Sequence, residues 1–209
     1  MPGERVTASK RVLDVAGALV LALLLAPLLL VAVAAVRLSS PGPTFFRQVR
    51  LGRDGSRFEM LKLRTMHVGA EDLLTSLLER DPERAAEFAA YGCLRRDPRV
   101  TGATGRWLRR WSVDELPQRW NGLRGDMSLV GPRPLPPHVA SLLDAEHRRV
   151  RASVRPGLTG PYQVNGRCDV DLVTMRELDL AYVARTSPAG DLVLIARTPW
   201  AVVSGAGAR

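Results

Sequence analysis

The sequence predicts an α+β fold: a small membrane-associated domain with an N-terminal re-entrant membrane segment, built as helix, break and helix, and with amphipathic surface helices. Residues 15–36 form an uncharged apolar run. Residues 45–63 place short apolar segments on either side of two glycines, which is typical of a β-hairpin. Residues 71–92 carry leucines at helical spacing. A chain of 209 residues holds one such domain, and we divide it into 1–38 (membrane segment) and 39–209 (catalytic domain).

The apolar run is long enough to cross the roughly 30 Å core of a bilayer as a helix. Pro27 lies near its middle, where proline removes a hydrogen bond and kinks a helix, so we expect a break at Ala26 and Pro27. Three interpretations compete. They are a single spanning helix, a re-entrant pair that enters and leaves on one side, and a cleaved signal peptide, whose apolar core is normally shorter.

Basic residues flank this run on both sides: Arg5, Lys10 and Arg11 before it, and Arg37, Arg47, Arg50, Arg53 and Arg57 after it. Arginine and lysine favour the cytoplasmic side of a membrane. A re-entrant pair puts both flanks there, whereas a spanning helix puts only one, so we favour the re-entrant pair. Asp14, at the edge of the run, is expected to form an ion pair with Lys10 or Arg11 one turn earlier.

The composition is strongly basic, with a net charge of +9 that comes almost entirely from arginine. Arginine binds phosphate well, although its excess over lysine also suits a bias of the source genome. Anionic partners are expected, but the chain has no helix-turn-helix, zinc-finger or RNP-type pattern, so nucleic acid is not. Cys93 and Cys168 lie far apart without a CxxC pair and are expected to be reduced thiols.

Two segments of the domain allow more than one interpretation. Lys62 and Arg64 alternate with leucines, which puts both cations on one face of a strand, either in a phosphate site or facing solvent. Residues 105–111 combine tryptophans with arginines, which suits either the lipid headgroup layer or a buried helix face. In residues 71–92, we expect Pro82 to separate two helices and the leucine stripe to face the core.

Residues 112–134 carry the densest cluster of functional candidates. Asp114 and Glu115 are adjacent carboxylates, and Arg133 stands between two prolines that restrict its backbone. Ser112 and Glu115 also have the spacing of a capping box, which would explain them without chemistry. The two interpretations are compatible, because a helix N-terminus binds anions and an ionised aspartate can attack phosphorus.

The sequence SVDELPQRWNGLRGDMSLVGPRP at 112–134 resembles the core motif of the bacterial sugar transferases, the monotopic polyprenyl-phosphate phosphoglycosyl transferases. KRVLD at 10–14, the stretch from PGPTFFRQVR to LKLRTM at 41–66, and RPGLTGPYQVNGR at 155–167 also match. The resemblance covers nearly the whole chain. It departs where the family commonly has serine before the helix-breaking proline (here Ala26), phenylalanine at Leu63 and asparagine at Cys168.

The resemblance implies a two-step reaction. Asp114 attacks the β-phosphate of a UDP-sugar, UMP leaves, and polyprenyl phosphate then accepts the sugar phosphate. Mg2+ contacts Asp114 and neutralises the diphosphate, while Glu115 assists with protons or metal. The implied phosphate- and substrate-binding residues are Lys62, Arg64, Arg133, Arg155, Gln163 and Arg167. The implied anchor of the membrane segment consists of Lys10, Arg11 and Asp14.

The expected function is therefore initiation of a surface glycan, such as an exopolysaccharide, at the cytoplasmic face of the inner membrane. The expected partners are a UDP-sugar, polyprenyl (undecaprenyl) phosphate and membrane lipids, with a homodimer left open. The chain is expected to be the short form, without a further membrane domain. The alternatives are a membrane-anchored binding or scaffold protein of the same fold without turnover, and a secreted domain behind a signal peptide.

Overall fold

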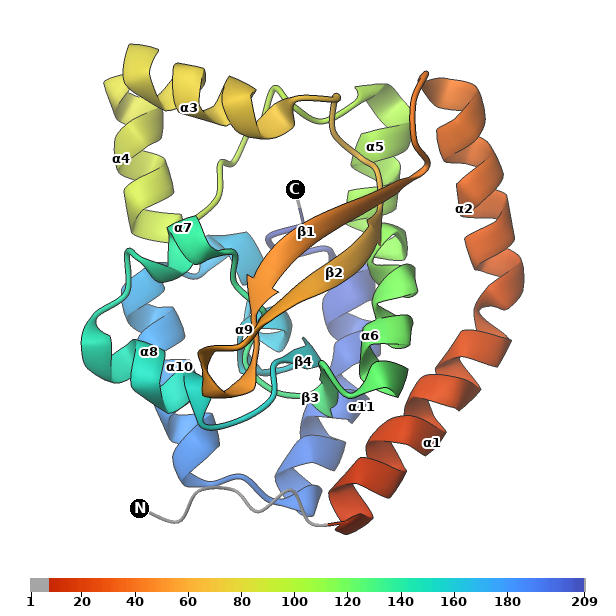
Figure 1. The fold of residues 1–209 in the computed structure, drawn as a ribbon, viewed down its shortest axis with the longest axis vertical. Helices are drawn as coiled ribbons and strands as arrows, with labels where there is room; N and C mark the ends of the chain where they lie inside the picture. Colours follow the sequence, from red (N-terminus) through yellow and green to blue (C-terminus); the bar gives the residue numbers. More distant parts are fainter. Residues whose placement is uncertain (1–7, 209) are drawn as a thin grey trace.

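The computed structural model describes residues 8–208, so Arg5 of the basic flank lies outside the described residues. Helices α1 (Ala8–Leu24) and α2 (Ala26–Ser39) form a bent rod along one side of the molecule (Figure 1). Their axes differ by 61°. No single helix in the described part of the chain has the length and hydropathy to cross a bilayer, whereas this bent pair does by length and composition.

The break lies at Leu25, one residue before the predicted position. Pro27 is in the first turn of α2. The N–H groups of a first turn have no partner within the helix, so proline costs no hydrogen bond there, and its fixed φ suits the helix. Ala32 and Val36 of α2, and Ala18 of α1, are buried against the rest of the protein. The other faces of the pair expose large apolar side chains: Val12, Leu13, Leu19, Val20, Leu21, Leu23, Leu24, Leu30, Val31 and Leu38.

Asp14 does not pair with the cations one turn before it, so that prediction was wrong. Its Oδ1 accepts hydrogen bonds from the Ser128 hydroxyl at 2.8 Å and from the Leu129 backbone N–H at 2.9 Å. Both donors belong to strand β3 (Ser128–Val130). The carboxylate is buried, and its partners are distant in sequence, which is why local spacing did not reveal them.

The two cations of this segment also bond across the fold. Lys10 forms an ion pair with Asp191. Arg11 donates to the carbonyl oxygens of Gly122 and Leu123 at 2.8 and 2.7 Å, at the end of helix α6 (Arg119–Arg124). A cation there complements the negative end of the helix dipole. All three predicted anchor residues therefore attach α1 to the rest of the protein.

The predicted β-hairpin is confirmed. Strands β1 (Phe45–Leu51) and β2 (Arg57–Leu63) are antiparallel, and their register pairs Phe45 with Leu63 and Leu51 with Arg57. A 3-10 turn, η1 (Arg53–Gly55), joins them. The hairpin crosses the middle of the molecule (Figure 1).

The division at Pro82 is also confirmed, because helix α3 (Ala70–Arg80) ends there and α4 (Pro82–Tyr91) begins. Leu74 is buried, while Leu73 faces solvent. In helix α5 (Gly102–Arg110) Gly105 and Leu108 are buried, while Trp107 and, just after the helix, Trp111 are exposed. The segment thus has a buried face and exposed tryptophans.

A second, parallel two-stranded sheet joins β3 to β4 (Gly157–Thr159). The remaining elements are η2 (Val113–Gln118), α7 (Pro137–Ala140), α8 (Ala145–Ala152), α9 (Pro161–Val164), η3 (Arg167–Asp169), α10 (Leu172–Ala184) and α11 (Pro188–Ser204). Helices with two small sheets agree with the predicted α+β class. One of the two buried apolar clusters consists of Ala32, Val36, Leu63, Leu108, Val113 and Leu116, so α2 shares a core with η2.

Candidate active site

The adjacent carboxylates lie on η2, a short 3-10 helix. Ser112 precedes it with φ 55°, in the left-handed region, and its side chain makes no capping hydrogen bond. An N-cap serine normally has extended backbone and accepts from the helix N–H groups. The capping-box interpretation was therefore wrong: the Ser112 carbonyl accepts from the Glu115 N–H, and the Glu115 side chain turns elsewhere.

Glu115 holds two cations with a single oxygen. Its Oε1 lies 3.1 Å from Lys62 Nζ and 3.3 Å from Arg133 Nη2. Burial alone would raise the pKa of Glu115, but the charges of Lys62 and Arg133 outweigh burial and hold that pKa far below its usual range. Glu115 is thus a permanent anion at neutral pH.

Asp114 differs from its neighbour. It is buried, and its side chain forms no hydrogen bond or ion pair with the part of the chain that the structure describes. Burial raises the pKa of Asp114; Lys62 opposes this shift and the charge of Glu115 adds to it. An unbonded carboxylate with a raised pKa keeps its lone pairs available for an electrophile or a metal.

Arg133 is fixed from several directions. Its guanidinium lies 5.7 Å from the centre of the Tyr162 ring, a cation–π geometry. Burial lowers its pKa, but Glu115 raises it above the ordinary value, so Arg133 stays charged. Its carbonyl oxygen accepts a hydrogen bond from Arg151, which also pairs with the fully buried Asp179. His147 Nε2 lies 3.0 Å from the same Asp179 oxygen.

These side chains surround a narrow pocket. It is lined by Met60, Lys62, Glu115, Gln118, Arg133, Pro134 and Gln163. Four of the residues predicted from the resemblance (Lys62, Glu115, Arg133 and Gln163) therefore meet here, from β2, η2, the Pro-Arg-Pro segment and α9. Asp114 adjoins them on η2.

The other predicted binding residues have different surroundings. Arg64 is buried and donates to the carbonyl oxygens of Ser40 and Pro41, just beyond α2, so neither cation of the Lys62–Arg64 pair faces solvent. Arg155 does not line the narrow pocket. Arg167 is close enough for its charge to lower the pKa of Glu115, and it adopts φ 50° at the start of η3.

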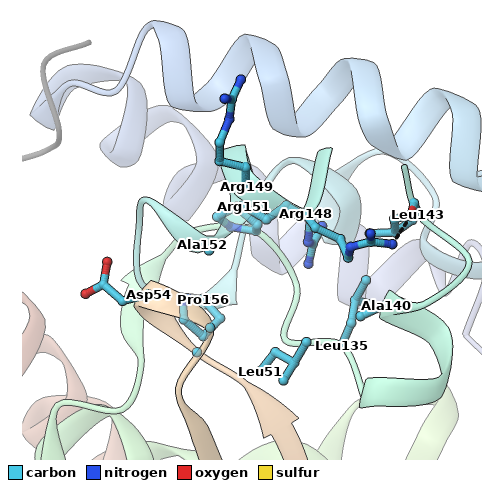
Figure 2. A pocket seen from close by; sticks show the side chains of 13 residues that line it. Leu51, Asp54, Leu135, Ala140, Leu143, Arg148, Arg149, Arg151, Ala152 and Pro156 are labelled. Atoms are coloured by element: carbon cyan, nitrogen blue, oxygen red, sulfur yellow. Dashed lines mark hydrogen bonds between the residues drawn. The ribbon is translucent and has the colours of Figure 1, made fainter. Parts of the chain in front are cut away.

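A larger cavity of about 330 Å³ lies against the same Pro132–Leu135 segment (Figure 2). Leu51, Leu135, Ala140 and Leu143 line it together with arginines of α8. The arginines do not converge: Arg149 points away from the cavity, and Arg148 donates to the Leu143 carbonyl. Arg148 and Arg151 of this basic segment are thus engaged in internal hydrogen bonds.

The acidic pair fits a magnesium ion only together with a substrate. Among the described residues, no group of three or more His, Cys, Asp or Glu side chains is placed to hold a metal. Glu115 Oε1 already contacts two cations, whereas the carboxylate of Asp114 pairs with no group of the described residues, so Asp114 is the less engaged of the two. Mg2+ commonly takes one or two carboxylates and completes its shell with phosphate oxygens and water. The donor set suits that arrangement and not a cage made by the protein alone.

Sequence reasoning missed Gln118, Tyr162 and the contact between the cysteines. Gln118 follows Glu115 by three residues, a spacing that eclipses side chains in a 3-10 helix, but the sequence suggested an α-helix there. Cys93 and Cys168 are both free thiols, as predicted. A hydrogen bond between them, with the charge of Arg133, lowers the pKa of Cys168 to about 6 against the effect of burial.

Comparison with known proteins shows similarity along nearly the whole chain. The profile of the family described as bacterial sugar transferase matches residues 5–205. The exopolysaccharide production protein ExoY of Rhizobium meliloti is 40% identical over 190 residues, which are 91% of this chain and 83% of that protein. The UDP-glucose:undecaprenyl-phosphate glucose-1-phosphate transferase of Caulobacter vibrioides is 44% identical over 95% of this chain and 71% of its own. The UDP-galactose-lipid carrier transferase of Erwinia amylovora is 38% identical over 95% of this chain, but over only 41% of its own length.

Proposed function

The chain belongs to the bacterial sugar transferase family, and from this premise we propose that it moves a sugar phosphate from a UDP-sugar to polyprenyl phosphate through an aspartyl intermediate. Relatives bear names of UDP-sugar:undecaprenyl-phosphate transferases and of an exopolysaccharide production protein, which supports this enzyme class and the start of a glycan as its role. The observation that carries the mechanism is the contrast within the acidic pair. Glu115 is bound to two cations, while the adjacent Asp114 is unbonded.

In the first step a carboxylate oxygen of Asp114 forms a bond to the β-phosphorus of the UDP-sugar. The bond from that phosphorus to the bridging oxygen breaks, and UMP leaves with the electron pair. Lys62 and Arg133 lie beside Glu115, where they stabilise the negative charge that develops on the phosphoryl oxygens. A magnesium ion held by Asp114 and the diphosphate supplies further neutralisation when bound.

In the second step an oxygen of the polyprenyl phosphate attacks the same phosphorus. The bond to Asp114 breaks, which regenerates the carboxylate and releases a polyprenyl diphosphate sugar. We assign to Glu115 the task of holding Lys62 and Arg133 at the phosphates rather than proton transfer, because its depressed pKa makes it a poor proton acceptor at neutral pH.

The membrane location is part of the proposal. We propose that α1 and α2 enter the cytoplasmic leaflet as a re-entrant pair, so that residues 1–38 anchor the catalytic residues 39–209 beside the lipid acceptor. The bend of 61° and the exposed apolar faces of both helices support this orientation. Cysteines placed at Val12 and Leu38 should both react with an impermeant maleimide in inverted vesicles and not in intact cells. Reaction of one of them in intact cells would indicate a spanning segment.

UMP release from a panel of UDP-sugars, with magnesium and undecaprenyl phosphate, tests the catalytic proposal. We expect turnover by the wild type and a loss of about 10³-fold or more in Asp114→Asn, since the nucleophile is gone. Without the lipid, the wild type should release about one UMP per protein and retain labelled sugar phosphate. No release without the lipid would contradict the covalent intermediate. Binding of UDP-sugar without any release would favour the scaffold interpretation.

A further inference from the structure

Two glutamine amides face the catalytic pocket without hydrogen-bond partners. Gln118 is 3% exposed and Gln163 is 7% exposed. The Nε2 of Gln118 and the Oε1 of Gln163 are fully buried, and neither bonds to any group in residues 8–208. Both residues line the pocket with Lys62, Glu115 and Arg133. The pocket therefore contains one unused donor and one unused acceptor.

The backbone brings these amides to the site from two sides. Gln118 follows Glu115 by one turn of η2, and in a 3-10 helix such residues eclipse. Gln163 lies on α9, which follows Gly160. A Cβ at Gly160 would overlap the carbonyl oxygen of Gly131, so this glycine lets α9 approach the segment that leads to Arg133.

A neighbouring amide shows what a purely structural role looks like here. Asn121 is buried like the two glutamines. Its Nδ2 donates to the Glu59 carbonyl at 2.7 Å and to Asp126 at 3.1 Å, and its Oδ1 accepts from the Leu61 N–H at 3.1 Å. An unpaired buried amide destabilises the fold. Other buried atoms of the described residues are also unpaired, such as Asp179 Oδ1, but Gln118 and Gln163 are the two whose side chains line the pocket beside Lys62 and Arg133.

The chemistry of the pocket indicates what each amide binds. Lys62 and Arg133 attract phosphate, and a phosphoryl oxygen accepts from an amide N–H. A diphosphate ester at neutral pH has no proton to donate, so it leaves an amide oxygen unsatisfied. That oxygen requires a donor such as a hydroxyl group. A UDP-sugar presents both kinds of group.

We propose that Gln118 donates a hydrogen bond to a phosphoryl oxygen of the UDP-sugar and that Gln163 accepts one from a hydroxyl of the same molecule. The inference rests on the proposed function: it adds Gln118 to the donor site, and it gives Gln163, which the resemblance implied only as a substrate-binding residue, a hydroxyl as its partner. The hydroxyl belongs either to the sugar, in which case Gln163 determines sugar specificity, or to the ribose, in which case it selects the nucleotide.

Methionine replacements separate a ligand role from a structural one. For Gln118→Met we expect kcat/KM for the UDP-sugar to fall about 10- to 100-fold, with the KM for undecaprenyl phosphate unchanged and Tm equal to or above that of the wild type. Gln118→Glu keeps the shape but replaces the donor with a negative charge, so it should be at least as inactive. A lower Tm with unchanged kcat/KM in Gln118→Met would overturn the assignment.

Gln48→Met is the matched control. The Gln48 amide donates to Glu71 at 3.0 Å and accepts from Arg50, so both of its ends are occupied, and it does not line the pocket. We expect the opposite pattern: a lower Tm and a kcat/KM within about twofold of wild type. If Gln48→Met and Gln118→Met lowered Tm alike, Gln118 would be structural and the assignment would be wrong.

Donor analogues identify the hydroxyl that Gln163 binds. UDP-sugars that each lack one sugar hydroxyl, and one with 2′-deoxyribose, are compared in the wild type and in Gln163→Met. One analogue should lose about 10-fold or more in kcat/KM with the wild type and lose nothing further with Gln163→Met. If every analogue lost equally in both proteins, the Gln163 assignment would fail while wild-type turnover still upheld the proposed function. A wild type that turned over no donor would overturn both.

Discussion

Two buried clusters in this protein share one arrangement and differ in what surrounds it. At Asp179 a single carboxylate oxygen is shared by His147 and Arg151, and Asp179 and His147 are 0% and 1% exposed. At Glu115 a single oxygen is shared by Lys62 and Arg133, and the Glu115 side chain is 24% exposed. Asp179 and His147 are enclosed, although Arg151 also lines the larger cavity, whereas Glu115 itself lines the narrow pocket. The shared-oxygen arrangement is a structural lock at Asp179, and we propose that at Glu115, where a ligand can compete for the cations, it forms a phosphate site.

The two clusters are also connected. Arg151 bonds to Asp179 with one nitrogen and to the carbonyl of Arg133 with another. The lock therefore fixes the backbone of the arginine that we assign to the substrate phosphates. Substitutions on the two sides should separate stability from catalysis.

The largest effect on stability is expected from Asp179→Ala. Removing this carboxylate leaves Arg151 buried without its charge partner, which typically costs about 3–5 kcal/mol of unfolding free energy. Thermal or denaturant unfolding in one detergent measures the loss. Glu146→Gln, which removes an exposed partner of Arg176, is the control and should cost about 0–1 kcal/mol. Equal losses in the two variants would contradict the structural-lock interpretation.

Glu115→Gln should reduce activity strongly and stability only slightly. Lys62 and Arg133 lose their shared anion, but solvent reaches this cluster, so we expect only about 1–2 kcal/mol of lost stability. UMP release should fall about 10²-fold or more, because two phosphate-binding cations are no longer held in place. A stability loss as large as that of Asp179→Ala, with activity retained, would mean that Glu115 is a second lock.

The pH dependence should distinguish the two neighbouring carboxylates. UMP release needs ionised Asp114, so it should rise with pH through the raised pKa of this group, about tenfold per unit on the acid side. The native state binds this proton more tightly than the unfolded chain does. Its contribution to stability is therefore present at low pH and is lost as pH rises through the raised pKa.

The contribution of Glu115 to stability depends on pH in the opposite direction. Its pKa is lowered in the native state, so its contribution is present above the ordinary carboxyl range and is lost as pH falls. Unfolding curves of Asp114→Asn and of the wild type across pH 4–8 isolate the contribution of Asp114 to the pH dependence of stability. If the variant kept the wild-type loss of stability with rising pH, Asp114 would not be its source.

The smallest effect is expected at Ser112. This residue precedes the acidic pair with φ 55°, and glycine adopts that conformation without strain. Ser112→Gly should therefore raise the unfolding free energy by about 0.5–1 kcal/mol. Ala152, at the end of α8 near the Asp179 cluster, has helical backbone; Ala152→Gly should lose about as much. If both glycine substitutions changed the unfolding free energy in the same direction, strain at Ser112 would be contradicted.

The parts of this fold that were predictable from sequence are those set by local periodicity and turn chemistry. Two glycines and alternating residues indicated the hairpin, and Pro27 and Pro82 marked two helix boundaries. The motif around Asp114 brought Lys62, Arg133 and Gln163 into one hypothesis, and they line one pocket. Predictions failed where the spacing suggested a local partner but the fold supplied a different contact, because spacing along the chain indicates only local partners.

Asp14 and Ser112 show this limit in physical terms. Asp14 had cations one turn away, yet in the fold a hydroxyl and a backbone N–H from β3 reach it. Ser112 had the spacing of a cap, yet its backbone adopts a left-handed turn. Arg64, which the sequence placed beside Lys62, donates to the chain after α2. For Asp14 and Arg64 the deciding partner is distant in sequence, whereas for Ser112 it is the backbone turn itself that differs from the expected cap.

The core shared by α2 and η2 bears on how this enzyme can be handled and altered. Ala32 and Val36 pack with Val113 and Leu116, which lie on either side of the acidic pair. Anchor and catalytic centre therefore fold cooperatively, and deletion of the first two helices removes one wall of the centre. A water-soluble form is better sought by polar replacement of the outward side chains, such as Leu23, Leu30 and Val31. The buried Ala18, Ala32 and Val36 must then remain unchanged.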